Sequence, residues 1–211
     1  MRSIILSLIL FSVTVGSKAN DAKSALSATE IVWFGLDFTK TVFAGGFDIT
    51  KGAGGTTGSD MKTKWIPGWN AMVMSRPEYF DLKTSFRKDN ILFDLKSVNK
   101  LNNKIDVAAC MQQVSLKIKK PVIDDMIKQY RPNVKKEGIG LSFIVESFNK
   151  ETQVADVYVT FFDIAESKVL ICEKVSGTAL GIGMLNSWSG AIKSILTQID
   201  TSEYTKWENK Y

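Results

Sequence analysis

The chain has 211 residues, with 27 Lys and Arg against 22 Asp and Glu, a net charge of +5, two cysteines and no histidine. Without histidine, the sequence excludes a Ser-His-Asp triad, a Cys-His pair and any metal site with histidine ligands. Basic and acidic residues are interspersed along the chain, so the mild positive charge does not predict a nucleic-acid-binding protein.

Residues 1–19 have the pattern of a cleaved export signal. Arg2 precedes an apolar run from Ile4 to Val15, and the small residues Ser17 and Ala19 fit the positions that a signal peptidase reads. The run is shorter than the roughly 20 apolar residues that cross a bilayer. We therefore predict a signal peptide over 1–19, no transmembrane span in the mature chain, and a location in the periplasm or outside the cell.

The first predicted strand of the mature chain covers residues 31–38. Its residues are nearly all apolar, and many are β-branched or aromatic, which is typical of a strand that is covered on both faces. Asp37 is the one charged exception. Glycines at 45, 46, 52, 54, 55 and 58 then predict a long loop. This loop lacks the Gly-Lys-Ser/Thr ending of a phosphate-binding loop.

The middle of the chain predicts helices separated by one strand. Residues 64–87 indicate one broken helix or two short ones, with Pro67 in a first turn. Residues 90–98 alternate as a strand with one wet face, and 99–104 are polar and turn-like. The stretch 107–118 is ambiguous, although the alternation over 114–119 favours a strand. Pro121 opens a helix over 121–131.

The C-terminal half gives the clearest pattern. Alternating runs at 138–148 and 154–164 and a third run at 169–175 are joined by short polar turns, which predicts an antiparallel meander. A Gly-rich link over 177–183 leads into an amphipathic helix over 184–199. Such a link can bind an anion at the helix N-terminus or simply let the helix fold back onto the sheet, and we favour the second interpretation.

These patterns predict one α/β (α+β) domain over residues 20–200. We expect a mixed, largely antiparallel sheet of five or six strands, with about three helices, at 64–87, 121–131 and 184–199, packed on one face. Residues 201–211 are charged with scattered aromatics, and we expect them to form a surface tail.

The two cysteines, Cys110 and Cys172, allow a disulfide in an exported protein but do not require one. Cys172 lies among strand residues, where a buried free thiol is common. A metal site would need more ligands. We predict no metal-binding, cofactor-binding or catalytic residues from the sequence.

One group of residues is a candidate for ligand binding. Trp65, Trp69 and Tyr79, beside Gly54 and Gly55 of the glycine-rich loop, could form a platform on which a sugar stacks. The alternative is that these aromatics pack the helix onto the sheet, and we favour it because large aromatics at helical spacing are mostly buried.

The C-terminal block also resembles a known arrangement. The segment Phe161-Phe162-Asp163-Ile164, the turn 165–168 and the run from Ser176-Gly177 onward resemble the curli-secretion and penicillin-binding-protein-activator lipoprotein group over residues 138–199. This chain lacks that group's lipobox cysteine. Together with the strand at 33–38 and residues 87–90, the same block resembles a family of exported, Bacteroidetes-type bacterial proteins. Neither resemblance implies catalytic residues.

Three functions are consistent with these observations. The first is a non-enzymatic protein of the cell envelope that binds a partner protein, as export and the absence of catalytic motifs suggest. The second is a carbohydrate- or small-ligand-binding protein that uses Trp65, Trp69 and the loop 45–58. The third is a hydrolase that works through carboxylates such as Asp37.

Overall fold

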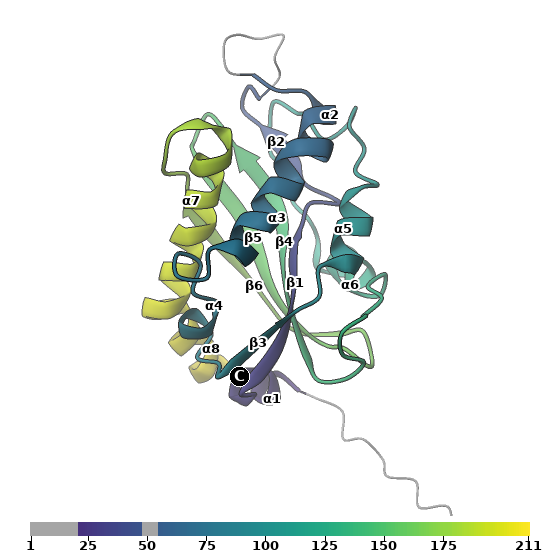
Figure 1. Cartoon of the computed structure of the whole chain (residues 1–211), viewed down its shortest axis with the longest axis vertical. Coiled ribbons are helices and arrows are strands. Elements are labelled where there is room, and N and C mark those ends of the chain that lie inside the picture. Colours follow the sequence, from purple (N-terminus) through teal and green to yellow (C-terminus); the bar gives the residue numbers. More distant parts are fainter. Residues whose placement is uncertain (1–20, 48–54) are drawn as a thin grey trace, which may run out of the picture.

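The computed structural model describes residues 21–47 and 55–211 (Figure 1). The predicted signal peptide and Gly54 lie outside the described residues. One mixed sheet forms the centre of the molecule, and its strands run in the order β3-β1-β4-β5-β6, with β2 also paired to β4. The strands are β1 (Glu30–Asp37), β2 (Val42–Ala44), β3 (Asn90–Phe93), β4 (Ile139–Asn149), β5 (Val154–Asp163) and β6 (Lys168–Thr178).

Two kinds of pairing meet in this sheet. β1 lies parallel to both β3 and β4, and β2 extends the same edge of β4 beyond the end of β1. β4, β5 and β6 form a long antiparallel meander whose ladders exceed the parallel ones. The mixed, largely antiparallel α+β fold predicted from the sequence is therefore confirmed, as is the meander in the C-terminal half.

One face of the sheet carries most of the helices (Figure 1). Its apolar cluster joins Trp33, Phe143 and Phe161 of the strands to Trp69, Trp188 and other helical side chains. The elements that contribute to it include α1 (Ala22–Ser27), η2 (Met61–Trp65), α3 (Ile66–Ser75), α4 (Leu82–Ser85), α7 (Gly183–Gln198), η3 (Ile199–Glu203) and α8 (Tyr204–Lys210), and α2 (Gly58–Asp60) leads into η2.

The opposite face is covered by α5 (Lys96–Asn102) and α6 (Lys120–Ile127). Val32 and Phe34 of β1 point into this second cluster, whereas Trp33 points into the first. Because both sides of β1 are apolar, both must be buried, and helices on one face alone would leave one side in water. The expectation that the helices at 64–87, 121–131 and 184–199 share one face was wrong for 121–131.

The sequence suggested that residues 201–211 form a surface tail, but this expectation was wrong. The π-helical turn η3 and the helix α8 dock this segment on the first cluster, where Tyr204 and Trp207 are buried. Lys88 strengthens the contact, since its Nζ donates to the Tyr204 hydroxyl at 2.9 Å and to the Leu26 carbonyl at 2.5 Å. The lysine thus ties the C-terminal end of α1 to α8.

Residues 114–119 do not form the strand that their alternation favoured. Val114 and Leu116 are exposed, and Ile118 is the buried member of the series. The Ile118 N–H donates to the Glu146 carboxylate at 2.8 Å instead of to a neighbouring strand. No helix among the described residues has the length and apolarity needed to cross a bilayer.

Candidate functional site

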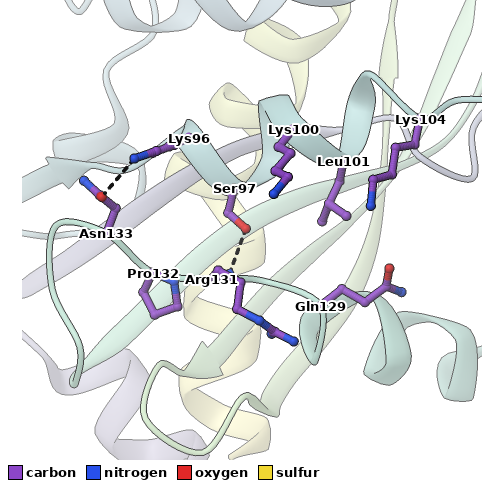
Figure 2. A pocket seen from close by; sticks show the side chains of 9 residues that line it. All are labelled: Lys96, Ser97, Lys100, Leu101, Lys104, Gln129, Arg131, Pro132 and Asn133. Carbon is purple, nitrogen blue, oxygen red and sulfur yellow. Dashed lines mark hydrogen bonds between the residues drawn. The ribbon is translucent and has the colours of Figure 1, made fainter.

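A groove lies between α5 and residues 129–133, which follow α6 (Figure 2). Its cavity volume is about 570 Å³. The residues that line it are Lys96, Ser97, Lys100, Leu101, Lys104, Gln129, Arg131, Pro132 and Asn133. We refer to this surface as the basic groove, because four of its side chains carry a positive charge and none carries a negative one.

The cations of the basic groove have no acidic partners. No carboxylate among the described residues forms an ion pair with Lys96, Lys100, Lys104 or Arg131. Lys96 approaches only the amide oxygen of Asn133, with 3.4 Å between Nζ and Oδ1. Concentrated charge of one sign in a concave surface raises the local concentration of counter-ions, so the groove favours anions.

Buried polar side chains fix the two walls of the groove relative to each other. Ser97 Oγ accepts from the Arg131 backbone N–H at 2.8 Å (Figure 2). Asp94, which directly follows β3, is buried and accepts from the backbone N–H groups of Asn133 and Val134, at 2.5 and 2.8 Å. Hydrogen bonds to Ser97 on α5 and to Asp94 just before it therefore hold the segment 131–134 in place.

The helix α5 is itself held against the end of β1. Asn102 is buried and bonds the backbone on both sides of Asp37, with its Oδ1 2.7 Å from the Phe38 N and its Nδ2 2.9 Å from the Leu36 O. Asn70 of α3 makes the matching contact from the other face, accepting from the Leu36 N–H at 2.8 Å. These amides satisfy backbone groups of β1 beyond the end of its pairing with β3.

Arg131 has donors left for a ligand. Its Nη1 donates to the carbonyls of Lys128 and Tyr130, at 2.7 and 2.8 Å, and so closes the C-terminal turn after α6. A guanidinium carries five N–H donors in a planar fork. Nη1 therefore orients the side chain, while Nε and Nη2 have no hydrogen-bond partner among the described residues.

The side chain of Tyr130, next to Arg131, points into the protein. Its hydroxyl donates to Asp37 Oδ2 at 2.8 Å and lies 3.0 Å from Ser142 Oγ, which in turn donates to the Gly35 carbonyl. Burial raises the pKa of Asp37, against the lowering effect of its hydrogen bonds from Thr39 and Tyr130. Asp37 is completely buried, so the carboxylate suggested for a hydrolase cannot reach a substrate.

The predicted aromatic platform is not assembled. Trp69 is buried, stacks on Phe38 and donates from Nε1 to the Leu185 carbonyl at 3.2 Å. Tyr79 is half-buried with its ring against Phe80. Trp65 is also half-buried, and Lys64 Nζ lies over its ring at 4.2 Å. Trp69 therefore offers no face to a sugar, because its ring packs against Phe38, Phe43 and Phe148. This packing is the alternative that the sequence favoured.

Trp65 and Gly55 instead border a second depression, with a cavity volume of about 460 Å³. Met184 and Trp188 of α7 line it from the other side. Trp188 is buried and stacks on Phe148, so Trp65 supplies the accessible ring here. The sugar-binding alternative therefore depends on one half-buried aromatic side chain.

Cys110 and Cys172 are both free thiols. Cys110 packs in the first apolar cluster, whereas Cys172 packs against the second, on the opposite face of the sheet. The disulfide that the export prediction allowed does not form, because the sheet separates the two side chains. Burial raises the pKa of the Cys110 thiol to about 11, which makes it unreactive at neutral pH.

The sequence analysis missed the basic groove. It assigned Lys96 to a strand and 99–104 to a turn. The available signal was the spacing of Lys96, Lys100 and Lys104, which recur every four residues as on one side of a helix. Arg131 gave no comparable signal, because a hydrogen bond to Ser97 and not a sequence pattern brings it to α5.

Comparison with known proteins adds no family assignment. No protein-family model, no curated protein and no solved structure matches this chain. The resemblance of residues 138–199 to the curli-secretion group stays a prediction.

Proposed function

We propose that this chain is an exported binding protein that holds an anionic ligand in the basic groove. The observation that carries the proposal is the presence of four cationic side chains around one cavity that form no ion pair with a carboxylate in the described part of the chain. Lysine and arginine on a protein surface are ordinarily mixed with acids. A concave site that keeps one sign of charge is best explained by a ligand of the opposite sign.

The lining of the groove favours binding over catalysis. It contains neither a carboxylate nor a thiol, and its hydroxyl, on Ser97, already accepts the Arg131 N–H. A nucleophile needs an adjacent base, and a general acid needs a titratable group near neutral pH. The groove instead offers fixed positive charge and the amides of Gln129 and Asn133, which suit recognition.

Isothermal titration with pyrophosphate at fixed ionic strength tests this proposal. The variant Lys96→Gln/Lys100→Gln/Lys104→Gln should lose measurable binding. The matched control is Lys23→Gln/Lys83→Gln/Lys168→Gln, which removes three exposed lysines elsewhere. The control therefore has the same net charge as the groove variant. If the control variant loses binding equally, the anion responds only to the overall charge and the proposal is wrong.

A second candidate function is the docking of a partner protein, which we expected from the sequence. It is favoured by Leu180 and Ile182, which are 64% and 93% exposed in the link before α7. The link is held in place, since the Leu180 N–H donates to the Ser187 carbonyl and Gly190 lets the Leu180 carbonyl approach so closely that a Cβ would lie 2.0 Å from it. A held loop that presents aliphatic side chains suits a contact surface.

The double variant Leu180→Ser/Ile182→Ser tests this second candidate. Cross-linking in the envelope fraction of the producing cell should show a protein adduct with the unaltered chain and lose it with the variant. Met74→Ser, at another exposed apolar position, is the control. An adduct that survives the double substitution would rule out this loop as the docking surface.

A further inference from the structure

The cations of the basic groove are arranged in a row. Lys96 and Lys100 lie on α5, and Lys104 lies in the turn that follows this helix, so the three lysines succeed one another at intervals of four residues from left to right in Figure 2. With a rise of about 1.5 Å per residue, Lys96 and Lys100 stand about 6 Å apart along the helix, and Lys104 lies beyond Lys100. A single phosphate-sized group cannot contact both ends of such a row, so the lysines serve either several ions or one extended ligand.

The other wall of the groove faces this row with a different chemistry. It contributes the guanidinium of Arg131 and the amides of Gln129 and Asn133 (Figure 2). Its position is fixed by the bonds from Ser97 and Asp94, so the spacing between the walls is set by the fold. A fixed spacing favours one ligand lying along the groove over a diffuse cloud of small ions.

The residues that line the groove also indicate that the ligand has neither a nucleobase nor an acyl chain. No aromatic side chain lines the groove, and its apolar residues are Leu101 and Pro132. Nucleobases are ordinarily held by stacking on aromatic rings, and acyl chains need an extended apolar surface. The ligand that fits is therefore hydrophilic along its length.

We propose that the basic groove binds a linear oligophosphate, with three or more anionic groups lying along the lysine row. This inference rests on the proposed function and specifies its ligand. An arginine fork binds both carboxylate and phosphate in a bidentate manner, whereas lysine lacks the fork that matches a planar carboxylate and acts as a point charge that suits phosphate oxygens in several directions. Three lysines with one arginine thus favour a chain of phosphates over an acidic peptide.

The length dependence of affinity tests the inference. Phosphate, pyrophosphate, tripolyphosphate and tetrapolyphosphate are titrated at equal ionic strength, with a tetraglutamate peptide in parallel. We expect the affinity to rise through the phosphate series. The end-of-row variant Lys104→Gln should weaken tetrapolyphosphate binding by about two- to fivefold, the range of an exposed ion pair. It should weaken phosphate binding less than tetrapolyphosphate binding.

The outcomes separate the inference from the function on which it rests. If none of the anions binds, both are wrong. If phosphate binds as tightly as tetrapolyphosphate, or if Lys104→Gln weakens both equally, the groove is an anion site without an extended ligand. If tetraglutamate binds more tightly than tetrapolyphosphate, the assignment to phosphate is overturned. Lys104 is exposed, so circular dichroism of Lys104→Gln should match the unaltered chain.

Discussion

The position of Lys96 predicts that its removal stabilises the protein. Lys96 is the first residue of α5, a helix that has no side-chain N-cap and no acid in its first turn. A positive charge there opposes the helix dipole, and charge–dipole interactions of this kind contribute about 0.3–1 kcal/mol. Lys100, four residues on, adds a like-charge repulsion of about 0.2–0.5 kcal/mol.

Both effects have the same sign, so Lys96→Gln should raise the free energy of unfolding by about 0.5–1.5 kcal/mol. The substitution also removes the hydrogen bond to Asn133, but this bond is 3.4 Å long and exposed, so its removal is a smaller effect. For a chain of this size, the gain corresponds to an increase in Tm of about 1–5 °C. Urea denaturation at low salt measures it, and the gain should shrink at high salt because exposed charges are screened.

Lys120 provides the control for this experiment. It is also the first residue of a helix, α6, but Asp124 lies four residues on, and the two side chains form an ion pair at 3.5 Å. In Lys120→Gln the relief of the unfavourable dipole interaction is offset by the loss of that pair, so we expect little change. If Lys96→Gln is neutral or destabilising at low salt, the lysine row carries no electrostatic cost and the argument for a ligand weakens.

Three further predictions concern the rest of the fold. Burial lowers the pKa of Lys88 from its ordinary 10.5 to about 8. Between pH 8 and 10.5, the amine of Lys88 therefore keeps its proton in the unfolded chain and has lost it in the folded chain. Lys88 should therefore contribute stability that rises from pH 8 toward 10 by up to about 3 kcal/mol, measured as the difference between urea denaturation of the unaltered chain and of Lys88→Met, because the raised pKa of the buried Cys110 acts in the opposite direction in both. Trp207→Ala, which removes a buried ring of α8, should cost about 3–5 kcal/mol, whereas the exposed Tyr211→Ala should cost less than about 1 kcal/mol; equal costs would mean that α8 does not dock. The native chain should react with a thiol reagent slowly at Cys110 and show two reactive thiols after denaturation, whereas no reactive thiol after denaturation would indicate a disulfide between the two cysteines.

The elements that could be predicted from the sequence are those whose pattern of apolar and polar residues follows from burial alone. β4, β5 and β6 are runs rich in apolar residues that are separated by polar turns, and the strand at 31–38 is apolar on both sides because both sides are covered. The strand predicted at 114–119 shows the limit of this reasoning. Its alternation was present, but no neighbouring strand pairs with it in the described part of the chain.

The missed elements depend on polar side chains or on a shifted period. α5 buries Ser97 and Asn102 beside Val98 and Leu101, and its polar members read as a turn because their hydrogen-bond partners are distant in sequence. At the C-terminus, the π-helical turn η3 displaces the 3.6-residue period. Tyr204 and Trp207 therefore fall off the stripe set by α7 and looked like scattered aromatics.

The most direct test of the account is a crystal structure of the protein grown with tripolyphosphate. We predict phosphate density in the basic groove, between Arg131 and the three lysines at positions 96, 100 and 104, with the Ser97 and Asp94 hydrogen bonds to residues 131–134 intact. Phosphate density at other surface lysines with an empty groove, at a concentration that saturates binding in solution, would contradict the central claim.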